Sequence, residues 1–106
     1  DATEWIPSET YDTIIDDGSH VSADIVKTWA HLWPYVKPGG LYVVEDLRCT
    51  HDKAYIESFE FPKPREDFAR RHILLWLDKL MQAMDYRQSD IDFIHYHREM
   101  ILIGKK

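Results

Sequence analysis

Two pairs of neighbouring acidic residues are the feature of this sequence with the clearest chemical meaning. Asp16 and Asp17 end one short apolar run, Glu45 and Asp46 end another, and Glu45 lies 28 positions after Asp17. Carboxylates that a fold brings together repel one another unless a positive charge neutralises them. Hard divalent cations such as Mg²⁺ prefer oxygen ligands. The two pairs therefore favour the catalytic edge of a metal-dependent enzyme.

The segments around these pairs predict a strand–helix–strand unit. Residues 11–16 are a short β-branched run that Asp-Gly-Ser stops, and residues 41–44 are a second apolar run. Between them, Ser22 can cap a helix, apolar residues recur at helical spacing over 25–36, and Pro-Gly-Gly at 38–40 predicts a tight turn. Strands joined in this way are parallel and end at the same edge of a sheet. The four carboxylates should converge there, where open α/β sheets bind their ligands.

The rest of the chain predicts a long loop, a second helix and a terminal hairpin. Residues 47–65 have no clear period and contain two prolines, which is typical of a functional lid or a disordered segment. A helix is expected from about residue 66 to 86. Its apolar stripe, which should pack on the sheet, is Phe68, Ile73, Leu74, Trp76, Leu77, Leu80, Met81 and Met84. Residues 90–97 and 100–103 read as strands, antiparallel because the turn between them, Arg98-Glu99, is so short.

The composition is that of one globular domain. The 106 residues are 44% hydrophobic, and no segment is long enough to span a membrane. The single cysteine, Cys49, cannot form an intrachain disulfide, so we expect a reducing, cytoplasmic setting. A net charge of −6 argues against nucleic acid and favours a small-molecule ligand; Arg65, Arg70 and Arg71 are more simply the solvated start of a helix. Because the first residue is Asp1 and not Met, we expect a piece of a longer protein.

The two acidic motifs together resemble a known family. Ile-Ile-Asp-Asp-Gly-Ser-His at 14–20, followed by Pro-Gly-Gly-Leu-Tyr-Val-Val-Glu-Asp at 38–46, is similar to class I S-adenosylmethionine-dependent methyltransferases. The closest resemblance is to the metal-dependent sugar O-methyltransferases of macrolide biosynthesis and their cephalosporin-hydroxylase-like relatives. It implies an α/β chain that is the second half of a Rossmann-like fold, with a mixed sheet ending in an antiparallel hairpin. Residues 1–106 would be a C-terminal half, because the Gly-rich cofactor loop of the family has no counterpart here.

The resemblance implies a metal site and a base. The metal carboxylates of the family fall on Asp17, Glu45 and Asp46, which would hold Mg²⁺; the alternative is that they are solvated acids at strand ends. His20 falls on the position of the general base that takes the hydroxyl proton, a role suited to an imidazole that titrates near neutrality. Its alternative role is a histidine at a helix start that bonds to the backbone.

Three further residues are candidates for binding S-adenosylmethionine. Alternation along the strand points Asp16 away from Asp17, so that it faces the methionine moiety of the cofactor or caps a turn. Gly18 would permit a close approach that a side chain would block. Asp1 stands near the place where an acidic residue of the superfamily contacts the adenine amino group, although a frayed terminus explains it equally well.

The remaining histidines and the aromatic residues of the long loop are weaker candidates. His51 could touch a substrate, whereas His95 and His97 share a face of the first hairpin strand with Ile91 and Phe93 and are expected to be packing or surface residues. Three aromatic residues of the loop could form a substrate wall or anchor the loop: Tyr55, Phe59 and Phe61.

The hypothesis that these residues favour is a methyltransferase that uses S-adenosylmethionine and Mg²⁺ to methylate a small-molecule hydroxyl, such as that of a sugar or natural product. A non-catalytic half-domain used in assembly or regulation is the alternative. A third reading is another α/β enzyme, such as a metal-dependent hydrolase. The exposed edge at residues 11–16 invites pairing with a second chain, so we expect a homo-oligomer.

Overall fold

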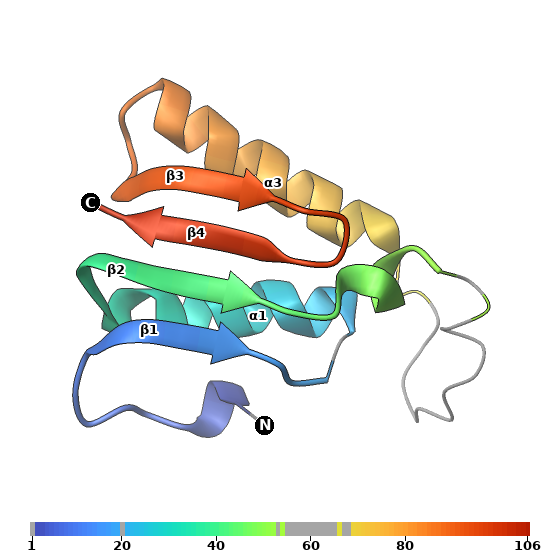
Figure 1. Ribbon diagram of the computed structural model, residues 1–106, viewed down its shortest axis with the longest axis horizontal. Helices are drawn as coiled ribbons and strands as arrows, with labels where there is room; N and C mark the ends of the chain where they lie inside the picture. Colours follow the sequence, from blue (N-terminus) through green and yellow to red (C-terminus); the bar gives the residue numbers. More distant parts are fainter. Residues whose placement is uncertain (1, 20, 53, 55–65, 67–68) are drawn as a thin grey trace.

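Four strands form a mixed sheet in the order β1-β2-β4-β3 (Figure 1). The structure, a computed structural model, describes residues 2–19, 21–52, 54, 66 and 69–106. The strands are β1 (Tyr11–Asp16), β2 (Val36–Val44), β3 (Ile91–Tyr96) and β4 (Ile101–Lys105). β1 and β2 are parallel, whereas β4 is antiparallel to both of its neighbours. Both the parallel pair and the terminal hairpin predicted from the sequence are confirmed.

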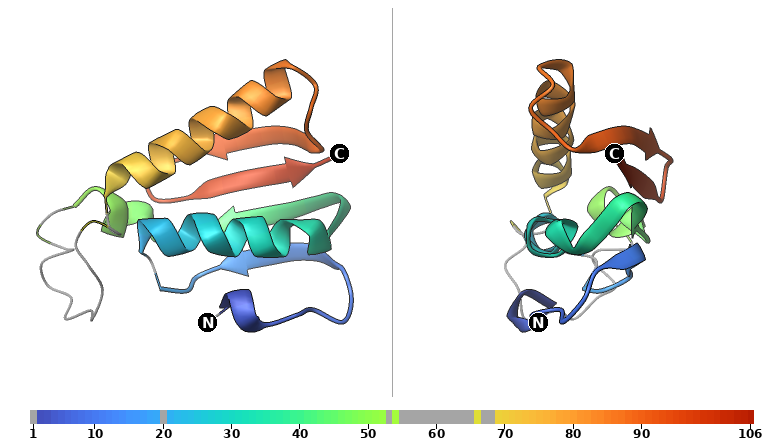
Figure 2. Two further views of the ribbon diagram at one scale, coloured as in Figure 1. Left: turned by 180° about the vertical axis from the view of Figure 1, so that it is seen from behind. Right: turned by 90° about the vertical axis from the view of Figure 1, so that its left-hand side faces the viewer.

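Both long helices lie on one face of this sheet. Figure 2 shows α1 (Ser22–Leu32) and α3 (Arg70–Asp85) side by side on that face. Within the described part of the chain, no helix covers the opposite face. The described residues also form short 3₁₀ helices, which are η1 (Ala2–Glu4), η2 (Trp33–Tyr35) and η3 (Leu47–Thr50). None of the described helices is long and apolar enough to cross a membrane.

The core lies between the sheet and the two helices. It consists of Ile25, Leu32, Trp33, Val36, Tyr42, Val44, Leu47, Ile73, Trp76, Leu77, Leu80, Ile91, Ile101 and Ile103. The apolar stripe predicted for α3 is therefore too wide. Leu74 and Met81 belong to that stripe but are about half exposed, at 52% and 50%. A helix that packs on a single layer buries a narrow face, and these two residues stand beside it.

α1 ends earlier than the apolar pattern predicts. The helix stops at Leu32, and residues 33–35 continue as η2. Pro34 has no backbone N–H to donate to the preceding turn, which disfavours a regular α-helix there. Val36, which the sequence pattern places on the helix face, is instead the first residue of β2 and is buried.

The Pro-Gly-Gly turn lies inside β2 and does not precede it. Tyr11 pairs with Val36 and the next paired residues are Thr13 and Leu41, so β2 carries extra residues between the two pairs. The excess forms a bulge, in which Gly39 has φ +81°. The sequence predicts a tight turn at residues 38–40 before a strand at 41–44, whereas the strand already begins at Val36 and contains these three residues.

A second irregularity separates two residues that alternation places on one face. The register between β3 and β4 shifts between Ile91 and Phe93. Ile91 is consequently buried in the core, whereas the ring of Phe93 covers Gly104 on the other face. The prediction that Ile91 shares a face with Phe93 and His95 is wrong because of this bulge; His95 does lie beside Phe93, with ring centroids 4.8 Å apart.

The β2 bulge predicts an unequal response to two neighbouring Gly→Ala substitutions. A Cβ at Gly40 would lie 2.6 Å from the carbonyl oxygen of Asp12 and 2.8 Å from that of Lys37, and backbone atoms cannot move aside easily. Gly40→Ala should lower the free energy of unfolding by about 2–3 kcal/mol, at the upper end of overpacking costs.

The control is Gly39→Ala, where a Cβ has open space and only the left-handed backbone is strained. It should cost roughly 1 kcal/mol. Urea unfolding of both variants measures the difference, and a Gly39→Ala variant as unstable as Gly40→Ala would contradict the close approach.

Candidate functional site

Three carboxylates meet where β1 and β2 end. Ligand oxygens of Asp17, Glu45 and Asp46 all lie within 4.8 Å of one another. The cause is the parallel register: Asp16 pairs with Val44, and the Glu45 amide donates to the carbonyl oxygen of Asp16 at 3.0 Å. The residues after this pair therefore leave the sheet together. The convergence expected from the sequence is found for these three residues.

The backbone turns sharply at the second acidic pair. Asp46 has φ 57° and ψ 42°, a left-handed conformation that Asp tolerates better than most residues do. The chain then enters η3, whose first residue, Leu47, is fully buried and donates its amide to the carbonyl oxygen of Glu99 at 3.0 Å. The buried side chain of Leu47 and its hydrogen bond to Glu99 thus fix the path of the backbone directly after Glu45 and Asp46.

The donor set fits a hard divalent cation. Oxygens that face one another across Mg²⁺ are about 4.2 Å apart, because each bond is about 2.1 Å. This is the largest separation that two ligands of one ion can have, so carboxylates within 4.8 Å of one another need to draw together only slightly to share an ion. Asp17 and Asp46 are exposed and Glu45 is half-buried, which leaves room for a ligand beside an ion.

Asp16 points away from the three-carboxylate cluster, as alternation predicts. Its Oδ1 accepts a hydrogen bond from the Gly18 amide at 3.2 Å, and the Tyr42 hydroxyl donates to its Oδ2 at 3.5 Å. The turn-capping role is therefore observed. Asp16 also lines a cavity, so capping does not exclude contact with a ligand.

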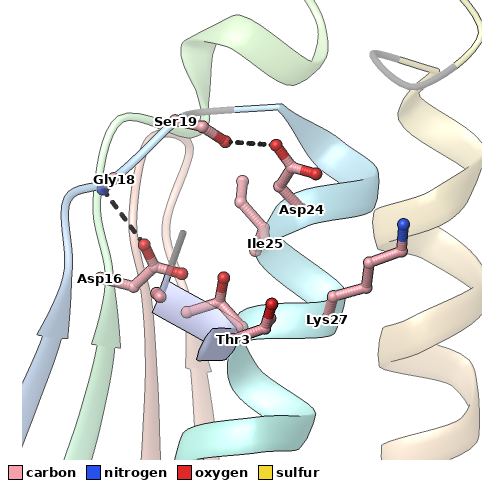
Figure 3. A pocket seen from close by; sticks show the side chains of 9 residues that line it. Thr3, Asp16, Gly18, Ser19, Asp24, Ile25 and Lys27 are labelled. Atoms are coloured by element: carbon pink, nitrogen blue, oxygen red, sulfur yellow. Dashed lines mark hydrogen bonds between the residues drawn. The ribbon is translucent and has the colours of Figure 1, made fainter. Parts of the chain in front are cut away.

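A cavity of about 530 Å³ lies between η1, the end of β1 and the first turns of α1 (Figure 3). Its volume is in the range of small-molecule sites. Asp16 and Gly18 are among its lining residues, which are Ala2, Thr3, Asp16, Gly18, Ser19, Asp24, Ile25, Lys27 and Thr28. Of the three residues predicted to bind cofactor, two therefore lie together on one cavity wall.

The sequence interpretation missed the contribution of α1 to this cavity. Asp24, Lys27 and Thr28 stand at helical spacing, which is the signal that could have indicated a shared face. The predicted cap is also wrong: Val21 is the N-cap and Ser22 is buried. Ser19, before the helix, bonds to its first turn instead. Its hydroxyl donates to Asp24 at 2.9 Å (Figure 3) and accepts from the Val21 amide at 3.3 Å.

The structure does not describe every predicted site residue. His20 and Asp1 are outside the described residues, as are Tyr55, Phe59 and Phe61. His51, His95 and His97 are exposed and belong to neither the cavity lining nor the carboxylate cluster.

Tyr42 is the group whose ionisation the site alters most clearly. Burial raises the pKa of its phenol strongly, and the negative charge of Asp16 and the hydrogen bond to it raise that pKa further. Tyr42 is fully buried under the end of β1 and stays neutral. It therefore acts as a hydrogen-bond donor that holds the Asp16 carboxylate.

In sequence, the chain is similar to several O-methyltransferases. It is 47% identical over 49 residues to the 8-demethyl-8-α-L-rhamnosyl tetracenomycin-C 2′-O-methyltransferase of Streptomyces olivaceus, a match that covers 46% of this chain and 13% of that protein. It is 54% identical over 37 residues to the mycinamicin VI 2″-O-methyltransferase of Micromonospora griseorubida, covering 35% and 9%. No protein-family model matches the chain.

In structure, the chain is similar to the MycE methyltransferase from the mycinamycin biosynthetic pathway. The structure of MycE in complex with Mg, SAH and mycinamycin VI matches 90% of this chain with a TM-score of 0.63 and 30% identity, over 25% of the MycE chain. A second structure, with Mg and SAH, matches with a TM-score of 0.65 and 27% identity. The resemblance to macrolide sugar O-methyltransferases and the expected α/β fold class are confirmed, and the chain spans about a quarter of the length of these solved relatives.

The raised pKa of Tyr42 predicts an alkaline loss of stability. The folded chain holds the phenol proton more tightly than the unfolded chain, whose tyrosine pKa is about 10. The resulting stability is fully present below about pH 10 and is lost as the pH rises above it. The free energy of unfolding should then fall by as much as about 1.4 kcal/mol per pH unit from this residue.

Tyr42→Phe should remove that part of the alkaline slope. Urea unfolding of the wild type and the variant at a series of alkaline pH values measures it. Equal slopes for the two proteins would show that Tyr42 does not carry the effect.

Proposed function

We propose that the chain is part of an O-methyltransferase that uses S-adenosylmethionine and Mg²⁺ to methylate a hydroxyl of a small molecule, such as a sugar of a glycosylated natural product. The observation that carries the proposal is the meeting of Asp17, Glu45 and Asp46 at the end of β1 and β2. This cluster lies in a chain 30% identical to a methyltransferase whose structure holds Mg and SAH. Residues 1–106 would supply the C-terminal half of the catalytic domain, with the Gly-rich cofactor loop in the remainder.

Asp17, Glu45 and Asp46 would hold the metal. Their carboxylates supply up to three of the six oxygen ligands that Mg²⁺ takes, which leaves positions for two neighbouring hydroxyls of an acceptor. When bound, the ion would act as a Lewis acid and lower the pKa of the acceptor hydroxyl. The three side chains also orient the acceptor, since they fix its oxygens at one end of the sheet.

His20 would be the general base. It stands three positions after Asp17 in the sequence, and its imidazole would accept the proton of the acceptor hydroxyl. The oxygen would then form a bond to the methyl carbon of the cofactor as the bond from that carbon to sulfur breaks. The products are the methyl ether, S-adenosylhomocysteine and a protonated His20.

The cavity beside η1 would receive part of S-adenosylmethionine. Asp16 presents a carboxylate to it, which suits the positively charged methionine moiety, and Gly18 leaves the approach open. Lys27 and Asp24 supply further polar groups from α1. Asp1 would contact the adenine amino group.

The setting and assembly of the protein are part of the same proposal. A reducing, cytoplasmic location agrees with the single Cys49. A homo-oligomer is proposed because β1 is an edge strand of the sheet described here. Nucleic acid is not among the proposed partners.

Calorimetric titration with S-adenosylmethionine, with and without Mg²⁺, tests the proposal on this chain and on its full-length parent. Binding by the parent and none by this chain would support the metal-bearing half of a methyltransferase. If neither protein binds S-adenosylmethionine, the alternative hypotheses are favoured: a non-catalytic half-domain, or a metal-dependent hydrolase that uses the acidic residues.

Removal of a single carboxylate should weaken metal binding. Asp17→Asn and Glu45→Gln should each weaken Mg²⁺ binding by more than about tenfold, since losing a ligand costs at least as much as losing an outer partner. Asp12→Asn is the matched control, because Asp12 is an exposed carboxylate of β1 that lies outside the cluster and forms an ion pair with Lys37 at 3.9 Å. If calorimetry finds the same Mg²⁺ affinity in Asp17→Asn, Glu45→Gln and Asp12→Asn, the carboxylate cluster does not bind the metal.

His20→Gln separates the proposed base from the metal ligands. In the full-length protein the variant should keep its Mg²⁺ affinity while kcat falls about 10²–10⁴-fold, the usual contribution of a general base. Steady-state methyl transfer gives kcat, and calorimetric titration with Mg²⁺ gives the metal affinity. A wild-type rate in this variant would assign the proton transfer to another group.

A further inference from the structure

Arg70 makes contacts that a solvated helix start does not explain. It is the first residue of α3, and one guanidinium nitrogen donates to Thr50 Oγ1 at 2.8 Å. Another nitrogen donates to the hydroxyl of Tyr96, the last residue of β3, and the guanidinium carbon lies 5.7 Å from the centre of that ring. One side chain therefore joins three elements at the end of the sheet where the carboxylates meet.

Thr50 passes this contact to the turn that follows the metal candidates. Thr50 is 2% exposed, and its hydroxyl donates to the carbonyl oxygen of Leu47 at 2.7 Å while it accepts from Arg70. Leu47 is itself fully buried and bonds through its amide to Glu99. The chain of contacts from Arg70 thus reaches the residue directly after Asp46.

The backbone around Asp46 needs the support of these contacts. Asp46 is held in a left-handed conformation, which is uncommon for a non-glycine residue even though Asp tolerates it better than most. The electrostatic repulsion among Asp17, Glu45 and Asp46 also opposes their approach in the absence of an ion. A fixed η3 turn resists both effects because it sets the path of the chain after Asp46.

We infer that Arg70 is a positioning residue for the metal site: through Thr50 it holds the η3 turn, and so keeps Glu45 and Asp46 in the arrangement that binds a divalent cation together with Asp17. The inference rests on the proposed metal role of these carboxylates. It assigns to Arg70 no contact with substrate or cofactor.

Mn²⁺ binding, followed by electron paramagnetic resonance, tests the inference without any measurement of activity. Arg70→Gln and Thr50→Val should each weaken binding about tenfold, in the range found for partners that orient metal ligands. Thr50→Ser keeps the hydroxyl and should bind as the wild type does. The matched control is Arg71→Gln, which should bind Mn²⁺ as the wild type does. Arg71 is the next residue, is mostly exposed and forms an ion pair with Glu66.

Amide hydrogen exchange of the metal-free chain gives a second readout. In Arg70→Gln the Leu47 amide should exchange about tenfold faster, while the Ile103 amide in the central strand β4 keeps its protection. If Ile103 also loses protection, the Arg70→Gln variant is unfolding as a whole. The Mn²⁺ affinities of Thr50→Val and Thr50→Ser then decide whether the contact through the Thr50 hydroxyl supports the metal site.

The outcomes separate this inference from the function on which it rests. Wild-type Mn²⁺ affinity and an unchanged Leu47 exchange rate in Arg70→Gln would overturn the positioning role alone. No Mn²⁺ binding by the wild type would overturn the metal part of the proposed function. Faster Leu47 exchange would then still show that Arg70 holds the turn, although no longer for a metal.

Discussion

The parallel pairing of β1 with β2 is the constraint on which the site depends. Its register sets Asp16 opposite Val44, so that the next residues of both strands leave the sheet at one place. A slip of one residue would turn Asp17 to the other face and separate it from Glu45. Because the three carboxylates repel one another, this register has to be stabilised by other contacts, and the buried side chains of Tyr42 and Val44, near the C-terminal end of β2, do so.

The sequence predicts the fold well where one short pattern determines one element. Residues 11–16 form the expected strand, and the short turn at Arg98-Glu99 makes the hairpin antiparallel. The predictions fail where the outcome depends on a distant partner. The exposure of Leu74 follows from how little of α3 the sheet covers, and the opposite faces of Ile91 and Phe93 follow from a register shift against β4. Neither is visible in the period of the segment itself.

The candidate site divides in the same way. The convergence of Asp17 with Glu45 follows from strand connectivity, and the opposite direction of Asp16 follows from alternation. Lys27 and Arg70 could not be assigned, because the first lines a cavity closed by η1 and the second meets partners 20 and 26 positions away in the chain. The sequence alone predicts that Arg70 is a solvated surface residue. In the structure it forms hydrogen bonds with Thr50 and Tyr96, beside the cluster of Asp17, Glu45 and Asp46.

The bond between Arg70 and Thr50 also has an evolutionary consequence. It joins the two ends of a stretch of 20 positions close to the carboxylate corner. The entropy of closing a loop rises slowly with its length, by about 0.6 kcal/mol for each doubling, so insertions between these two residues are tolerated. The cost of lengthening the sequence between Thr50 and Arg70 is therefore small, so this pair could keep its bond while the number of residues between the two changes.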